Sequence, residues 1–408
     1  MVKFFIVCTL SLCSLNFFGQ QCDSSLITVR KIRASDTDSR ISWELATHYT
    51  FFNENCAPQN TLLIYLVGSY DNPLNSLKFP SLAANHGYHV VSLKYPNSVA
   101  AKTACAASTD PNCYLNFRKE IIEGVDYSNK VTVNDTDCIQ NRLLKLIQHL
   151  SAFFPAENWD QYIIGNKMNW EKVMTAGHSQ GGGHAAVLGI NNALKRVLMF
   201  ASPNDYSNHF NAPSVWCSGT FSTPASAFYG FNNLQDDVVS FDEQKQIWAA
   251  MPFSTNDDTT SVDSFTSPFG NSHMLYTNYH GGTETSQNHN AVVRDSHTPL
   301  TNLGRPAYEE VWKYMLENDL KTSVFAKKRL KKYRLSPNPV EKSFFITKND
   351  KFLTFSKIEI YNIQGEKIKS ISQHLSDKIV VRGLSSGIYF AVISTEDAQN
   401  VKIKFIKL

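Results

Sequence analysis

Short runs of apolar residues, separated by polar and helical segments, recur between residues 25 and 319. Near-continuous apolar runs are typical of parallel strands that are buried on both faces of a sheet. The pattern predicts such strands at residues 62–68, 88–94, 172–177, 196–202, 226–231 and 273–277. Apolar residues at helical spacing predict helices between them, most clearly over 137–154 and 306–318. This alternation predicts an α/β domain over residues 21–320, with a mostly parallel sheet flanked by helices.

The pattern changes near the C-terminus. From residue 335 onward, apolar and polar residues alternate with period two, and Gln364-Gly365 and Ser386-Gly387 mark turns. We therefore predict a small all-β sandwich over residues 335–408. Basic residues cluster at 327–334, within a predicted linker over residues 321–334. The cluster has no repeated pattern of interleaved aromatic residues, so we interpret it as solvated linker and expect no nucleic-acid partner.

The N-terminus carries Lys3, a short apolar stretch from Phe4 to Leu12, and a polar exit after Gly19. This arrangement predicts a secretory signal peptide over residues 1–20, and the apolar stretch is too short for a transmembrane helix. No later segment is apolar enough to span a bilayer. The net charge of +3 is small for 408 residues and indicates no strongly charged partner.

Export predicts disulfides, because the chain meets an oxidising compartment. Six cysteines follow the predicted signal peptide, and six allow 15 connectivities. Cys105 and Cys113 flank a loop-like stretch and are the preferred pair, and Cys22 with Cys56 is a further pair. No Cys/His spacing indicates a zinc site, and the acidic stretch 256–263 is interpreted as a solvated loop rather than a calcium site.

The segment AGHSQGGGHAA places Ser179 among small residues, and Gly177-His178-Ser179-Gln180-Gly181 fits the pattern GxSxG. A predicted strand precedes it and a predicted helix follows it. A serine on such a sharp turn exposes its hydroxyl, and glycines two residues before and after avoid collision with neighbouring backbone. The helix N-terminus directs amides toward an oxyanion. The segment therefore predicts a nucleophile elbow formed by Gly177, His178 and Gly181 around Ser179.

Two family resemblances follow from these motifs. Residues 62–318 resemble the α/β-hydrolase superfamily, and in particular a group of secreted bacterial hydrolases, through LVGSYDNP, GYHVVSLKYPNS, FRKEIIEG, AGHSQGGGHAA and HNAVVRD. Residues 335–408 resemble the C-terminal sorting domain of type IX secretion cargo through SPNPV, IEIYNIQGEKI and LSSGIYFAVIS. The second resemblance implies recognition by the type IX secretion machinery and a secreted or surface-attached protein.

The hydrolase resemblance implies a Ser-His-Asp triad in the chain order Ser179, acid, histidine. Asp236 is the preferred acid because Val238-Val239 follow it as in hydrolase acid loops, and Asp237 is the alternative. His289 is the preferred base because it lies in the matching HNAVVRD segment, and His297 is the alternative.

The resemblance also implies an oxyanion hole made by the backbone amides of Ser69 and Gln180, with Tyr70 as a further neighbour. We expect a secreted serine hydrolase that cleaves carboxylic esters through an acyl-enzyme, with no metal or organic cofactor. A serine peptidase on the same fold and a non-catalytic surface binding module are the alternatives.

Overall fold

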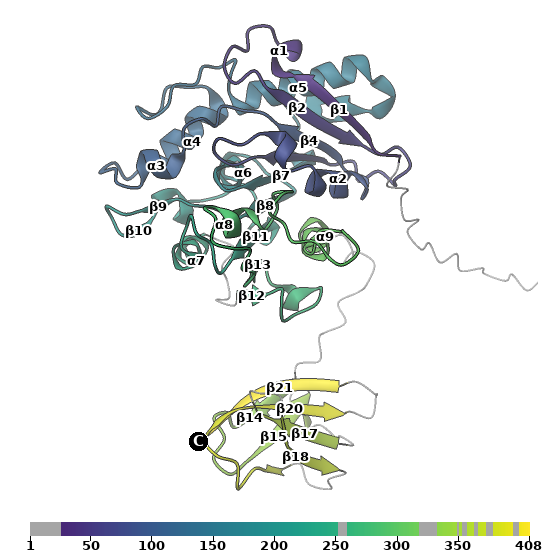
Figure 1. The fold of residues 1–408 in the computed structure, drawn as a ribbon, viewed down its shortest axis with the longest axis vertical. Helices are drawn as coiled ribbons and strands as arrows, with labels where there is room; N and C mark the ends of the chain where they lie inside the picture. Colours follow the sequence, from purple (N-terminus) through teal and green to yellow (C-terminus); the bar gives the residue numbers. More distant parts are fainter. Residues whose placement is uncertain are drawn as a thin grey trace, which may run out of the picture. The chain divides into compact units, whose positions relative to one another are not determined.

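The protein consists of two compact units, residues 1–318 and 319–408, each with its own hydrophobic core. The computed structural model describes residues 26–251, 259–317, 333–348, 351–352, 357–362, 366–372, 378–394 and 400–408. The predicted signal peptide, Cys22, most of the predicted linker and part of the acidic stretch 256–263 lie outside the described residues. Figure 1 labels the helices and strands of both units.

A nine-stranded sheet forms the centre of the first unit, in the order β1-β2-β4-β3-β7-β8-β11-β13-β12. Its strands are β1 (Thr28–Arg33), β2 (Thr47–Phe52), β3 (Leu62–Leu66), β4 (His89–Leu93), β7 (Val173–His178), β8 (Arg196–Phe200), β11 (Phe228–Asn233), β12 (Thr260–Ser261) and β13 (Met274–Thr277). All neighbours from β4 to β12 pair in parallel, whereas β1 and β2 pair antiparallel with each other and β2 with β4. The predicted mostly parallel sheet is confirmed.

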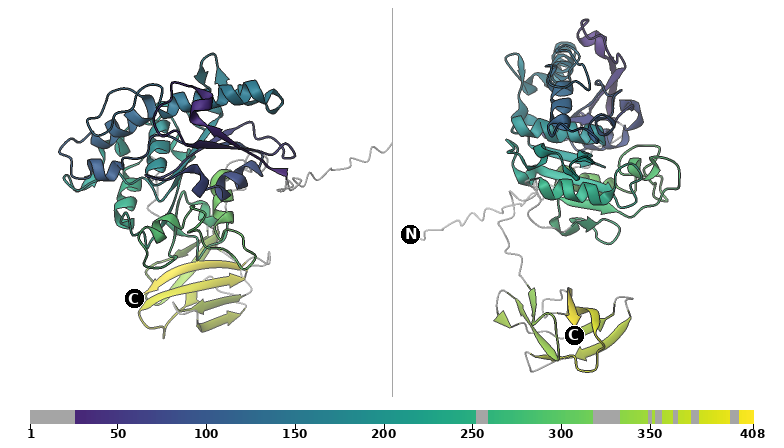
Figure 2. Two further views of the ribbon diagram at one scale, coloured as in Figure 1. Left: turned by 45° about the horizontal axis from the view of Figure 1, so that its top comes forward. Right: turned by 90° about the vertical axis from the view of Figure 1, so that its left-hand side faces the viewer.

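Helices cover both faces of this sheet, as the two views of Figure 2 show. Helices α2 (Lys78–Ala84) and α9 (Glu309–Glu317) pack together on one face. Helices α4 (Cys113–Glu123), α5 (Ile139–Phe153) and α6 (Gln180–Asn191) pack on the other. The other α-helices of the unit are α1 (Ala34–Thr37), α3 (Ala101–Cys105), α7 (Phe241–Ala250) and α8 (Gln287–Asn290). Two short antiparallel pairs complete the unit: β5 (Ile163–Ile164) with β6 (Lys167–Met168), and β9 (Tyr206–Ser207) with β10 (Ala212–Pro213).

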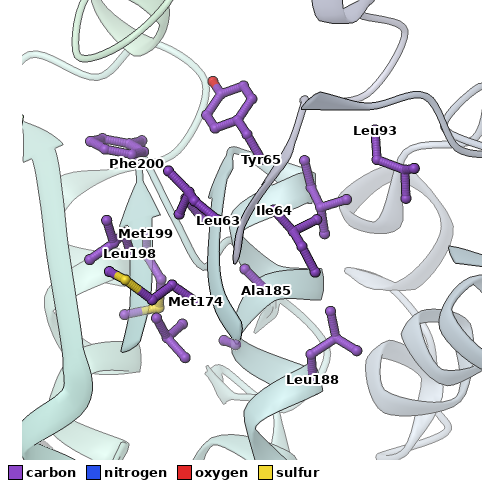
Figure 3. Packing of buried hydrophobic residues seen from close by; sticks show 14 of the residues in the cluster. Leu63, Ile64, Tyr65, Leu93, Met174, Ala185, Leu188, Leu198, Met199 and Phe200 are labelled. Carbon is purple, nitrogen blue, oxygen red and sulfur yellow. The ribbon is translucent and has the colours of Figure 1, made fainter. Parts of the chain in front are cut away.

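The core lies against both faces of the central strands, whose side chains alternate between them. Tyr65 of β3 and Phe200 of β8 contact Phe79 of α2, with ring centroids 5.7 and 5.0 Å away. Figure 3 shows Ala185 and Leu188 of α6 beside the buried side chains of β3, β7 and β8. Strands β3, β4, β7, β8 and β11 are buried along their whole length. This burial explains why their sequences are mostly apolar.

The N-terminal strands β1 and β2 are absent from the predicted set. Strand β1 has the sequence TVRKIR, and its burial alternates because it lies at the edge of the sheet. Its antiparallel partner β2 reads THYTFF, in which polar and apolar residues are mixed. Neither strand forms the continuous apolar run by which the buried parallel strands were predicted.

The second unit contains two antiparallel sheets that share one core. One consists of β14 (Tyr333–Ser336), β15 (Ser343–Lys348), β16 (Lys351–Phe352) and β19 (Ile379–Val380). The other consists of β17 (Lys357–Tyr361), β18 (Lys367–Ser372), β20 (Gly387–Ser394) and β21 (Asn400–Lys407). Phe344 of the first sheet contacts Phe405 of the second, with ring centroids 5.1 Å apart. The predicted small β-sandwich is confirmed.

Cys105 at the end of α3 forms a disulfide with Cys113 at the start of α4, with a Cα–Cα distance of 5.6 Å. This predicted pair is confirmed. Cys56 is also disulfide-bonded, and its predicted partner lies outside the described residues. Cys138 and Cys217 are free, buried thiols, so the even cysteine count does not mean that every cysteine is paired. None of the helices within the described residues has the length and hydrophobicity needed to cross a membrane.

Candidate functional site

Ser179 lies between the last residue of β7 and the first residue of α6, with φ 53° and ψ −120°. A non-glycine residue with positive φ is strained, and a sharp strand-to-helix turn is a known setting for it. The Ser179 amide donates to the carbonyl of Phe200, and the Ser179 carbonyl accepts from the Gly182 amide at 3.1 Å. Strand pairing on one side and the first helical turn on the other therefore hold this conformation.

Two glycines make the turn possible by allowing close backbone contact. A Cβ at Gly177 would lie 2.3 Å from the carbonyl carbon of Gly181. A Cβ at Gly181 would lie 2.1 Å from the carbonyl oxygen of Leu66 in β3. Both distances are far below a normal contact, so α6 could not pack this closely on β7 and β3 with larger residues. These distances agree with the sequence-based expectation that glycine at both positions avoids collision with neighbouring backbone.

Asp236 and His289 form a buried hydrogen-bonded pair. Nδ1 of His289, in α8, lies 2.8 Å from Oδ2 of Asp236 in the loop after β11, and both side chains are buried. The other carboxylate oxygen accepts from the amides of Val238 and Val239, each at 2.9 Å. Burial alone would raise the pKa of Asp236, but the His289 charge, the His289 hydrogen bond and these two amides hold that pKa below its ordinary value.

The alternative acid and base occupy different positions. Asp237 does not contact the imidazole of His289 among the described residues; its Oδ1 accepts from the His289 backbone amide at 3.1 Å. The ring of His297 contacts the Ser296 hydroxyl, 2.8 Å from Nδ1. The structure therefore brings together Asp236 and His289, while Asp237 holds the backbone of the same loop.

Ser179 and His289 line one cavity of about 520 Å³, at the end of the sheet where the parallel strands terminate. Ligand sites in α/β folds lie at this carboxyl edge. Nε2 of His289 is buried and makes no hydrogen bond within the described chain. The contact of the Ser179 hydroxyl is instead with the side-chain amide of Asn204, 3.3 Å away in the loop after β8. The Ser179 hydroxyl thus lies beside Asn204. His289, whose Nε2 makes no hydrogen bond within the described chain, lines the same cavity.

Asn204 was not predicted. If its amide nitrogen faces the carbonyl oxygens of Ala201 and Pro203, at 3.1 and 3.2 Å, its oxygen accepts the hydrogen bond from Ser179 Oγ. This orientation gives every polar atom a suitable partner. In the sequence, the one feature that could have pointed to Asn204 is its position just after the carboxyl end of the predicted strand 196–202.

His178, the other predicted elbow residue, supports the His289 loop. Its Nε2 donates to the carbonyl of His289 at 3.3 Å, and the two rings lie 4.9 Å apart. Burial, and then the nearby His289, lowers the pKa of His178 to about 3. His178 is therefore neutral at physiological pH, and its contact with the His289 backbone helps to fix the position of that residue.

The two predicted oxyanion residues contact each other. The Ser69 hydroxyl, in the loop after β3, donates to Oε1 of Gln180 at 2.9 Å. Oε1 also accepts from the Ala101 amide at 2.7 Å, and Nε2 of Gln180 donates to the carbonyl of Val99 at 3.0 Å. The Gln180 side chain thus joins the loops after β3 and β4 to the first turn of α6.

The backbone amides of Ser69 and Gln180 donate no hydrogen bond to protein groups among the described residues. The Tyr70 amide differs, because it donates to the carbonyl of Asn97 at 2.9 Å. Nδ2 of Asn97 in turn donates to the carbonyl of Gly68 at 2.7 Å. Asn97, which was not predicted, fixes this loop and leaves Ser69 rather than Tyr70 with a free amide.

Arg118 of α4 is a further residue that the sequence analysis missed. It is buried, pairs with Asp205 through two nitrogens, and donates to the Gln180 carbonyl at 2.9 Å. Trp216 donates to the same carboxylate at 2.7 Å. A Cβ at Gly183 would lie 2.2 Å from the guanidinium carbon, so this glycine provides the space for Arg118. The buried ion pair holds the first turn of α6 in place.

Side chains that could ligate a metal do not cluster in the described part of the chain. Among the described residues, no group of three or more His, Cys, Asp or Glu side chains could hold a metal ion. Asp263, the described end of the acidic stretch, accepts from Thr277 Oγ1 at 2.8 Å and from the Asn278 amide at 2.6 Å. Its carboxylate therefore has a structural role beside β13.

Comparison with known proteins identifies the second unit. Residues 334–407 match a family described as secretion system C-terminal sorting domain. The C-terminal unit is a type IX secretion sorting domain. The sorting domain implies an interaction with the secretion machinery, as predicted. It also indicates a secreted or cell-surface protein. No match to the chain was found among curated protein sequences.

Proposed function

We propose that the first unit is a serine hydrolase that cleaves carboxylic esters, with Ser179 as nucleophile, His289 as base and Asp236 as the acid that orients His289. The observation that carries this proposal is the combination of a strained serine between β7 and α6 with a buried Asp236–His289 pair beside the same cavity. A histidine fixed through Nδ1 by a carboxylate presents Nε2 to the nucleophile.

The proposed reaction begins with a rotation of the Ser179 side chain. In the resting state its hydroxyl contacts Asn204 at 3.3 Å. Bound ester favours a rotamer in which Oγ reaches Nε2 of His289, since catalytic hydrogen bonds often form fully only with substrate present. Oγ then attacks the ester carbonyl carbon while its proton passes to His289. Asp236 stays ionised and stabilises the imidazolium.

The tetrahedral intermediate carries a negative oxygen, which the amides of Ser69 and Gln180 bind. Loss of one such donor typically costs about 3 kcal/mol of transition-state stabilisation. As the intermediate collapses, the alcohol leaves with the proton from His289, and the acyl group remains on Ser179. A water molecule then gives a proton to His289 and attacks the acyl carbon. The carboxylic acid leaves, and the proton returns to Ser179.

Covalent labelling of the mature protein with a fluorophosphonate tests this function. We expect labelling of the folded wild type and its loss after heat denaturation or in Ser179→Ala. The matched control is Ser218→Ala, which removes an exposed serine that does not line the cavity. Labelling that persists in Ser179→Ala, or a folded wild type that takes no label, would overturn the proposal. A matched ester and anilide pair would then test whether esters are the preferred substrates.

A further inference from the structure

Most of the residues that line the cavity beside Ser179 have polar side chains. Its aliphatic lining consists of Ala100, Ala101 and Val238, and hydroxyl, amide, imidazole and charged side chains form most of the rest. Its volume of about 520 Å³ lies in the range of small-molecule sites. The composition favours an ester with a polar group close to the scissile bond.

Three cationic side chains line this cavity: Lys102, Arg118 and Arg294. Each of the three guanidinium nitrogens of Arg118 donates a hydrogen bond, to Asp205 or to the Gln180 carbonyl. Nζ of Lys102 contacts the carbonyl of Val238 at 3.1 Å and Glu243 at 3.5 Å. Both cations therefore have anionic partners outside the cavity lining.

Arg294 is bonded much less completely. Its one hydrogen bond within the described chain joins Nη2 to Oδ1 of Asp71 at 3.3 Å. That oxygen also accepts from the Asn72 amide at 2.9 Å and from Nδ2 of Asn75. Nε of Arg294 is buried and has no partner in the described residues. Since a guanidinium has five N–H donors, most of its donor capacity is unused.

His297, which lines the same cavity, does not add a second cation. Burial, and then the Arg294 charge, lowers the pKa of His297 below its ordinary value. The His297 ring is therefore neutral at neutral pH and is a polar, uncharged neighbour of Arg294 in the cavity lining. The guanidinium is therefore the main positive charge available to a ligand in this part of the cavity.

We propose that Arg294 binds a carboxylate carried by the ester substrate, so that the preferred substrates are esters with an anionic group near the scissile bond. This inference rests on the proposed hydrolase function. A carboxylate matches the planar fork of a guanidinium through two parallel hydrogen bonds. With one hydrogen bond to Asp71 within the described chain, the guanidinium keeps donors for such a group.

Paired substrates test the charge separately from size and polarity. On the acyl side we compare 4-nitrophenyl hydrogen succinate with 4-nitrophenyl succinamate, and on the alcohol side O-acetylglycolate with O-acetylglycolamide. For one of the two pairs, wild type should prefer the carboxylate in kcat/KM by about 10- to 100-fold, as expected for a hydrogen bond between charged groups. Arg294→Gln should abolish this preference mainly through KM, and Arg294→Lys should keep part of it.

Arg305→Gln is the matched control, because it removes an exposed arginine outside the cavity and should leave the preference unchanged. Calorimetry of Ser179→Ala with monomethyl succinate gives a readout that needs no turnover, and Arg294→Gln in that background should weaken binding. Equal kcat/KM for both members of each pair, or a preference that survives Arg294→Gln, would overturn the inference. If wild type also takes no fluorophosphonate, the hydrolase proposal itself has failed.

Discussion

The Ser69 hydroxyl donates to Oε1 of Gln180 at 2.9 Å, which links two residues 111 positions apart whose free amides lie in the proposed oxyanion hole. The same Gln180 side chain bonds the backbone of Val99 and Ala101. The positions of both amides therefore depend on one neutral side chain. This relationship makes Gln180 important for its side chain as well as for its backbone.

We expect Gln180→Ala to reduce ester turnover by about 10- to 100-fold, since the amides lose alignment without being removed. The three lost hydrogen bonds should also lower the free energy of unfolding by about 1–3 kcal/mol. Steady-state kinetics and urea unfolding measure the two effects. Ser69→Ala is the control: it removes one of the three bonds and keeps both amides, so its kinetic effect should be smaller. A larger effect of Ser69→Ala would contradict this account.

The identity of the base can be tested with a pair of histidine variants. His289→Ala should lower ester turnover by several orders of magnitude, as Ser179→Ala does, because members of a triad act as a unit. His297→Ala should retain most activity, since its ring contacts Ser296 rather than Asp236. Turnover of a 4-nitrophenyl ester by the purified variants gives the comparison. The reverse result would make His297 the base and His289 a loop residue.

Local patterns made the sheet and the sharp turn at Ser179 predictable. Strands β3, β7 and β8 are buried on both faces, and their mostly apolar sequences indicate this burial directly. The conformation of Ser179 follows from its immediate neighbours, because Gly177 and Gly181 provide the space for the turn. These features depend on residues close together in the chain, and for this reason they could be predicted without knowledge of the fold.

Other parts of the site depend on long-range contacts that the sequence pattern does not reveal. Asn204 and Arg118 come from the loop after β8 and from α4, and packing alone brings them to Ser179 and Gln180. The choice between Asp236 and Asp237 depends on which carboxylate faces His289, and adjacent acids look alike in sequence. The polar side chain of Arg118 is buried, against the usual preference for exposure, because Asp205 pairs with it.

The Cys105–Cys113 disulfide closes a short loop between α3 and α4. Its loss should lower the free energy of unfolding by about 2–3 kcal/mol at most, since the entropy of loop closure grows slowly with loop length. Denaturant unfolding of Cys105→Ser/Cys113→Ser against wild type measures this difference. Peptide mapping of the exported protein checks the bond itself, and two free thiols there would refute the assignment.

Acid should destabilise the first unit through its buried histidines. Burial lowers the pKa of His48 and His178 to about 3, and that of His184 well below its ordinary value. An unfolded histidine titrates near about 6.5, so the unfolded state binds more protons below that pH. The stability contributed by these neutral rings is complete above about pH 6.5 and declines as the pH falls toward about 3.

His184→Leu tests this directly, because both ring nitrogens of His184 are buried without a partner in the described chain. The free energy of unfolding should depend less steeply on pH, by up to about 1.4 kcal/mol per pH unit below pH 6.5. Urea unfolding between pH 7 and pH 4.5 measures the slope. The exposed His209→Leu serves as control. Identical slopes for wild type and His184→Leu would show that His184 does not titrate on unfolding.

Removal of residues 335–408 should leave a folded first unit that is no longer exported, because each unit has its own core. The sorting domain accounts for the loss of export. Circular dichroism and fluorophosphonate labelling assess the truncated chain, and immunoblotting of culture medium assesses secretion in both forms. An insoluble, unfolded first unit or normal secretion of the truncated chain would contradict the expectation.

The three consecutive glycines in the first turn of helix α6 each lie against a different neighbour. A Cβ at Gly181 would meet Leu66 of β3, one at Gly182 would lie 2.4 Å from Ser202 Oγ, and one at Gly183 would meet Arg118. Alanine would be the better helix former at each position by about 1 kcal/mol, so intrinsic helix propensity favours replacement of all three. Any compensating change would have to move a strand, a loop and a helix separately. Packing therefore blocks single substitutions to alanine at three successive positions. As a result, the first turn of α6 keeps a low helix propensity.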